Sequence, residues 1–129
     1  MSKSTPLIYE NVFGKRALAR IKDTEKTITI AMAAGKGVII EAVALNEALE
    51  VITKAYPGQT IKLRVSVRND GDDDYIWYTV KDVDAGTIID QPVGNPYLKK
   101  GEVLVRTGAN QTMPSKNWNL LVEAGHGLP

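Results

Sequence analysis

The chain has 129 residues, of which 43% are hydrophobic and 24% charged, a composition typical of one globular domain. It contains no cysteine and one histidine, which excludes disulfides and thiolate catalysis and leaves transition metals without their usual ligands. No stretch reaches the length of an apolar membrane span, and no apolar signal core follows the first residues. We therefore expect neither a membrane span nor export by the usual signal route, and the localisation stays open.

The net charge of +1 conceals an uneven distribution. Residues 1–36 carry seven basic and three acidic side chains, whereas residues 37–129 carry nine basic and twelve acidic ones. A basic arm on an acidic body can contact nucleic acid or an acidic surface on another copy, and the alternative is a solvated arm. Nucleic acid is the less favoured partner, because no aromatic residues are interleaved with the charges. The candidate contact residues in this arm are Arg16, Arg20 and Lys22.

The N-terminal segment predicts an extended arm that leads into a hairpin. Residues 1–24 show no period, whereas residues 27–32 alternate so that Ile28, Ile30 and Met32 share one face. A Gly-Lys-Gly turn separates them from an apolar run over residues 38–45, which is hydrophobic on both faces and is therefore central or covered. We expect the arm and the first hairpin strand over residues 1–36, and a β-sandwich domain over residues 37–129.

Residues 46–55 allow two interpretations. Asn46 is a suitable N-cap, and Leu45, Leu49 and Ile52 lie at helical spacing, which predicts one short helix. The alternative is an edge strand over residues 50–53.

The clearest pattern lies between residues 59 and 84. Two strict period-two runs, at residues 61–68 and 75–81, flank a polar turn, and each predicts a strand with one wet face. Shorter apolar runs follow at residues 87–89, 102–106 and 118–122, separated by Gly, Pro, Asn and Asp. Several short strands with such turns predict an all-β, immunoglobulin-like antiparallel sandwich.

Two turn signatures carry a resemblance to a known class of domain. The run from Pro57-Gly58 through the alternating strand to Asn69-Asp70-Gly71, together with Asp82-x-Asp84-x-Gly86, resembles CARDB-type and related immunoglobulin-like domains. The resemblance covers roughly residues 38–124. It implies an accessory module of a surface, adhesion or virion protein, since such domains rarely catalyse reactions.

Catalytic, cofactor and metal sites are not predicted. His126 lies in a glycine-rich tail, which is a poor place for a general base. The Gly35-Lys36-Gly37 turn is too short for a phosphate loop. The acidic residues 70–74 do not follow the helix-loop-helix calcium pattern, so a soluble turn is favoured over a calcium site.

The outward faces of the two best-defined strands supply further candidates. If Ile76 and Val80 point into the core, then Tyr75 and Trp77 point outward, and a core position for Trp77 is the alternative. The same rule places Arg64 and Arg68 on an outer face. We expect a non-catalytic structural or assembly subunit, of the virion, capsid-decoration or surface-layer type, that self-associates or binds other structural proteins. The alternative is a carbohydrate- or protein-binding module that uses the aromatic residues around Trp77.

Overall fold

The computed structural model describes residues 19–128, and every regular element within them is a β-strand. The strands are β1 (Gly37–Leu45), β2 (Val51–Ile52), β3 (Thr60–Asn69), β4 (Asp74–Asp82), β5 (Thr87–Asp90), β6 (Tyr97–Leu98), β7 (Val103–Thr107), β8 (Gln111–Thr112) and β9 (Leu120–His126). All of their ladders are antiparallel. The prediction of an all-β antiparallel sandwich is therefore confirmed. None of the described residues belongs to a helix long and apolar enough to cross a membrane.

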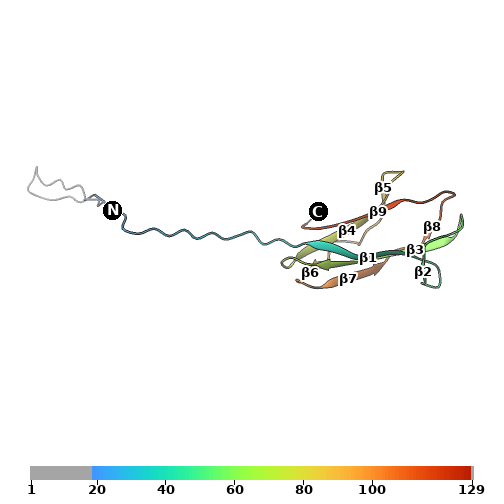
Figure 1. Cartoon of the computed structure of the whole chain (residues 1–129), viewed down its shortest axis with the longest axis horizontal. Helices are drawn as coiled ribbons and strands as arrows, with labels where there is room; N and C mark the ends of the chain where they lie inside the picture. Colours follow the sequence, from blue (N-terminus) through green and yellow to red (C-terminus); the bar gives the residue numbers. More distant parts are fainter. Residues whose placement is uncertain (1–18, 129) are drawn as a thin grey trace, which may run out of the picture. The chain divides into compact units, whose positions relative to one another are not determined.

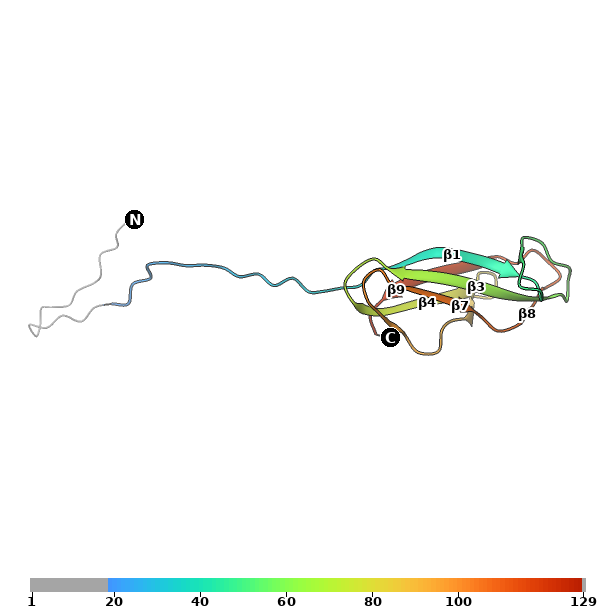
Figure 2. The ribbon, with the colours of Figure 1, turned by 90° about the horizontal axis from the view of Figure 1, so that it is seen from below.

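The strands form two sheets. One has the order β2-β1-β3-β7, with β8 paired to the start of β3, and the other has the order β5-β4-β6, with β9 also paired to β4. In Figure 1, β4, β5 and β9 lie above β1, β3 and β7. Figure 2 shows β1, β3 and β7 running side by side. The chain enters the sandwich at the start of β1, and β2 and β8 lie at the opposite end of that strand (Figure 1).

The core lies between β3 and β4, the two strands with the strictest alternation. Val65 and Val67 of β3 pack with Ile76, Tyr78 and Val80 of β4, and all five side chains are fully buried. Each buried side chain of this size stabilises the fold by roughly 1.5–3 kcal/mol. The inward and outward faces of both strands therefore follow the sequence pattern.

The short helix predicted for residues 46–55 is wrong, and the alternative edge strand is right. Leu49 has a φ of 62°, a left-handed conformation that ends any helical path. Asn46 closes a turn instead, because its side-chain oxygen accepts the backbone N–H of Glu50 at 2.9 Å. The chain then returns as β2 and pairs Ile52 with Ala44 of β1.

The hairpin predicted across residues 35–37 is also wrong, because residues 27–32 form no strand. The residues just before β1 are instead hydrogen-bonded to the loop over residues 69–74. Asp72 N–H donates to the Ala34 carbonyl at 3.0 Å, and Asp70 N–H donates to the Lys36 carbonyl at 2.8 Å. These bonds leave no tight turn at Gly35, so β1 pairs with β3 and β2 and not with the preceding segment.

Candidate interaction surfaces

The predicted arm residues are open to solvent where the structure describes them. Arg16 lies outside the described residues. Arg20 is exposed, and Lys22 forms an exposed ion pair with Glu25. An exposed pair at this spacing contributes little to stability, so both basic groups stay accessible to a partner.

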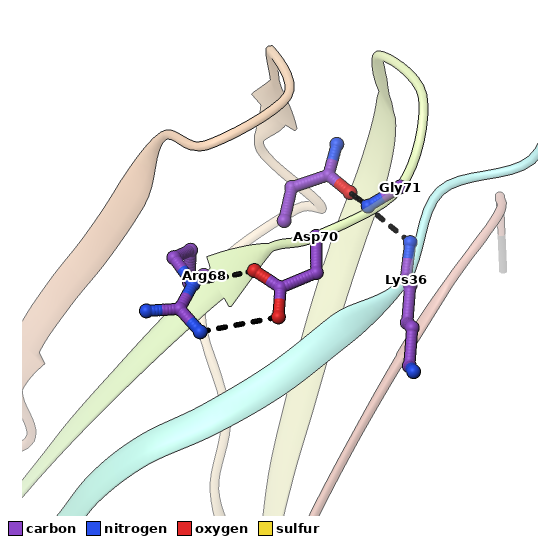
Figure 3. Close-up of polar contacts among 5 residues, drawn as sticks. Lys36, Arg68, Asp70 and Gly71 are labelled. Carbon is purple, nitrogen blue, oxygen red and sulfur yellow. Dashed lines mark hydrogen bonds and ion pairs between the residues drawn. The ribbon is translucent and has the colours of Figure 1, made fainter.

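Arg64 and Arg68 lie on the outer face of β3, and each is paired within the chain. Arg64 Nε lies 2.8 Å from Glu41 Oε1, and its Nη2 lies 3.1 Å from Glu41 Oε2. The hydrogen bond from Arg64 lowers the pKa of Glu41. Arg68 binds both carboxylate oxygens of Asp70 in the same bidentate geometry (Figure 3), which lowers the pKa of Asp70. Both guanidinium groups therefore help to order their own sheet.

Tyr75 and Trp77 lie on the outer face of β4, as predicted. Their alternation partners Ile76 and Tyr78 are buried, which confirms the orientation. The Tyr75 ring meets Tyr97 edge to face at 5.1 Å. The Trp77 indole lies against Gly125 of β9, and its Nε1 donates to the His126 carbonyl at 3.3 Å. The outer face of β4 belongs to a different sheet from that of β3, so the aromatic and basic candidates do not form one site.

Asn69 is a hub that the sequence analysis did not identify. Its side chain is fully buried at the end of β3. Its Oδ1 accepts the backbone N–H groups of Lys36 and Gly71, each at 3.0 Å. Its Nδ2 donates to the carbonyls of Asp72 and Leu98 at 2.8 and 2.9 Å. In Figure 3, dashed lines mark the hydrogen bonds made by the backbone nitrogens of Lys36 and Gly71. The Asn-Asp-Gly sequence indicated only a turn, because the four partners come together only in the folded chain.

The acidic turn fixes the chain around this hub. Asp72 and Asp74 accept the backbone N–H groups of Ala34 and Gly35 at 3.2 and 2.9 Å, and Asp73 accepts that of Lys100 at 2.9 Å. The bonds from the backbone of Gly35 and of Tyr75 lower the pKa of Asp74. These carboxylates are thus directed at backbone donors, and together they set the direction in which residues 34–36 approach β1.

The segment before this point presents an apolar stripe. Ile28, Ile30 and Met32 are 80%, 88% and 91% exposed. We call residues 27–32, with these three side chains on one face, the arm stripe. Thr27, Thr29 and Ala31, on the other face, are exposed as well. Alternating apolar residues in an extended segment have the pattern of a strand that packs on a sheet.

A second unpartnered apolar feature is a hollow between the two sheets at the β2 and β8 end. Its volume is about 900 Å³, and we call it the end groove. Its apolar lining includes Ala44, Ile52, Ile61, Leu63, Trp118 and Leu120. Trp118 is fixed in this wall because its Nε1 donates to Asp82 Oδ2 at 3.0 Å, a bond that lowers the pKa of Asp82. This hollow could not be predicted from the sequence, because the residues that line it are dispersed along the chain.

Comparison of the chain with known protein families, with curated proteins and with solved structures finds no match.

Proposed function

We propose that this protein is a non-catalytic structural subunit that assembles with further copies of itself, or with other structural proteins, through its N-terminal arm. The observation that carries the proposal is the arm stripe, in which three large apolar side chains of strand-like spacing are 80–91% exposed. A cluster of exposed apolar side chains is unfavourable in water and commonly marks a protein–protein contact.

The hydrogen bonds that attach residues 34–36 to the sandwich support the same proposal. Backbone bonds to residues 69–74 tie Ala34, Gly35 and Lys36 to the sandwich at three successive positions. A segment that orders on a partner loses about 1–2 kcal/mol of conformational entropy per residue, so a fixed starting point reduces the cost of assembly. The resemblance to CARDB-type domains agrees with this role and stays a prediction, as does the virion or surface-layer setting.

The experiment compares two triple variants of the full chain that carry the same change in charge. Ile28→Asp, Ile30→Asp and Met32→Asp together alter the apolar face of the arm stripe. Thr27→Asp, Thr29→Asp and Ala31→Asp together alter its other face and serve as the matched control. Light scattering over a range of concentrations measures the mass of each. We expect the first triple variant to stay monomeric and the control to assemble like the unmodified chain.

Two outcomes contradict the proposal. If the unmodified chain has the mass of a single copy at every concentration and no structural partner binds it, then the arm does not serve assembly. If both triple variants lose assembly equally, then added charge is responsible and the apolar face is not.

The carbohydrate-binding alternative has weaker support. It depended on free aromatic faces around Trp77, and the Trp77 indole lies against Gly125 of its own chain. Tyr75 and Tyr97 meet edge to face and so do not form a flat platform.

A further inference from the structure

We infer that β7 of one copy pairs edge to edge with β7 of a second copy, in antiparallel direction and about a two-fold axis at Val105. This inference rests on the proposed function, because it names a second contact between copies that the arm has brought together.

β7 is an open edge of its sheet. It pairs with β3 on one side, and none of the described strands pairs with its other side. Strand edges are usually protected by a lysine, a proline or a β-bulge. β7 contains neither lysine nor proline, and its register with β3 runs without a shift from Val103 to Thr107. The edge therefore lacks these common barriers to pairing with another chain.

Two hydrogen bonds that flank β7 show which of its backbone groups are free. The Asn69 N–H donates to the Glu102 carbonyl at 3.0 Å, and the Gly108 N–H donates to the Leu63 carbonyl at 2.8 Å. Bonded positions alternate along an antiparallel ladder, so the even-numbered residues of β7 bond to β3 and the odd-numbered residues direct their N–H and C=O groups outward. Within residues 19–128 no backbone hydrogen bond reaches these outward groups, which belong to Val103, Val105 and Thr107.

The same three residues present uncharged, β-branched side chains to solvent. Val103 and Val105 are 45% and 60% exposed, and Thr107 is exposed as well. Residues of this type favour strand pairing, because their branched side chains pack well against a neighbour across the ladder. The backbone and the side chains of this edge thus both suit an added strand.

A second β7 matches this edge at each outward position. In antiparallel pairing about a two-fold axis, Val105 faces Val105 of the second copy, and Val103 faces Thr107 of the second copy. Each facing pair brings an outward N–H of one copy to an outward C=O of the other in both directions, as in a hydrogen-bonded pair of an antiparallel ladder. The edge is therefore complementary to itself, which is the requirement for a two-fold contact between identical chains.

The charged groups nearest the edge do not oppose this pairing. Arg106 is the one charged residue of β7, and its Nη1 lies 2.8 Å from Oδ1 of Asp90, which is buried. In the two-fold pairing Arg106 faces Leu104 of the second copy and not another cation. Arg64 and Arg68, which lie beside the edge on β3, are bound to carboxylates of their own chain. Two copies can therefore approach without repulsion between unpaired like charges.

The contact is too small to hold two copies by itself. The five residues of β7 span about 17 Å, so pairing along them buries much less than the roughly 800 Å² per partner of a stable interface. Copies that the arm already holds together meet at a much higher effective concentration, which makes a weak second contact favourable. We therefore expect β7 pairing within the assembly and not between free copies.

The test introduces single cysteines into the full-length chain, which has none. In the two-fold pairing the Cα atoms of the two copies of residue 105 lie about 5.5 Å apart, within the range of a disulfide. The two copies of residue 103 lie about 14 Å apart, which is too far. After oxidation of the assembled protein, we expect Val105→Cys to give a disulfide-linked dimer on a non-reducing gel. Val103→Cys alone and Thr107→Cys alone should give little, and a mixture of these two should give the dimer.

Leu121→Cys, at an exposed position on β9 of the other sheet, is the matched control for chance collision and should link little. If the copies assemble by light scattering but Val105→Cys links no more than Leu121→Cys, this inference is wrong and the proposed function stands. The same holds if Val105→Cys links to an added Thr29→Cys in preference to a second Val105→Cys, because the arm then occupies the edge. If the unmodified chain never exceeds the mass of one copy and binds no structural partner, the proposed function fails and this inference fails with it.

Discussion

Trp77 and Gly125 face each other directly across the β4–β9 ladder, and a Cβ on Gly125 would lie 2.5 Å from Cζ2 of Trp77. The missing side chain at Gly125 leaves room for the indole against the neighbouring strand. The outward aromatic residue is thus covered partly by its own sheet, and its indole N–H is bonded to the His126 carbonyl.

This contact predicts a specific coupling. Gly125→Ala should lower the free energy of unfolding by about 1–3 kcal/mol, because the methyl group forces the indole to move. In a Trp77→Ala background the same change should cost little. Trp77→Ala itself should cost less than the roughly 3–5 kcal/mol of a fully buried tryptophan. Urea denaturation of the unmodified chain, the two single variants and the double variant measures the four free energies of unfolding that this comparison needs. An equal cost of Gly125→Ala in both backgrounds would contradict the contact.

Asn69→Ala should be among the most destabilising single changes in the sandwich. It removes four hydrogen bonds from a fully buried side chain, each worth about 0.5–1.5 kcal/mol, so we expect a loss of about 2–6 kcal/mol. Asn69→Asp keeps the acceptor for Lys36 and Gly71 but places a carboxylate oxygen against two carbonyls, and it should be no better tolerated. Asn110→Ala, at an exposed position, is the matched control. Equal unfolding midpoints for Asn69→Ala and Asn110→Ala would rule out the hub.

The acidic turn predicts a dependence of stability on pH. The pKa of Asp74 is lowered in the folded chain, first by the backbone N–H of Gly35. Its ionised form therefore stabilises the fold above the ordinary pKa of about 3.9, and this stabilisation is lost as the pH falls through the folded pKa. Asp74→Asn should flatten the fall in unfolding midpoint between about pH 5 and 2. Superimposable curves for the variant and the unmodified chain would show that Asp74 does not contribute.

Strict alternation made β3 and β4 predictable, because burial of one face imposes period two on residues such as Val65, Val67 and Ile76. The same pattern at residues 27–32 predicted a hairpin strand, and these residues form no strand. Alternation shows that a segment can pair and does not show with which edge. The helical spacing of residues 46–55 predicted a helix that does not form, because the positive φ of Leu49 interrupts it. The end groove could not be predicted from the sequence, because its lining residues come from separate segments that meet only in the folded chain.

Stepwise truncation should separate the basic part of the arm from its apolar stripe. Removing residues 1–24 leaves Ile28, Ile30 and Met32 in place. It deletes Arg16, Arg20 and Lys22, and with them most of the positive charge of the arm. We therefore expect the sandwich to stay folded and the assembly to weaken. Removing residues 1–33 also deletes the stripe and should abolish assembly, while β1 and its bonds to residues 69–74 remain. Circular dichroism checks the fold and light scattering checks the mass. If the longer truncation assembles as well as the shorter one, the stripe has no role in contact between copies. If the shorter truncation fails to fold, the arm belongs to the core, contrary to the reading of residues 1–24 as an extended segment.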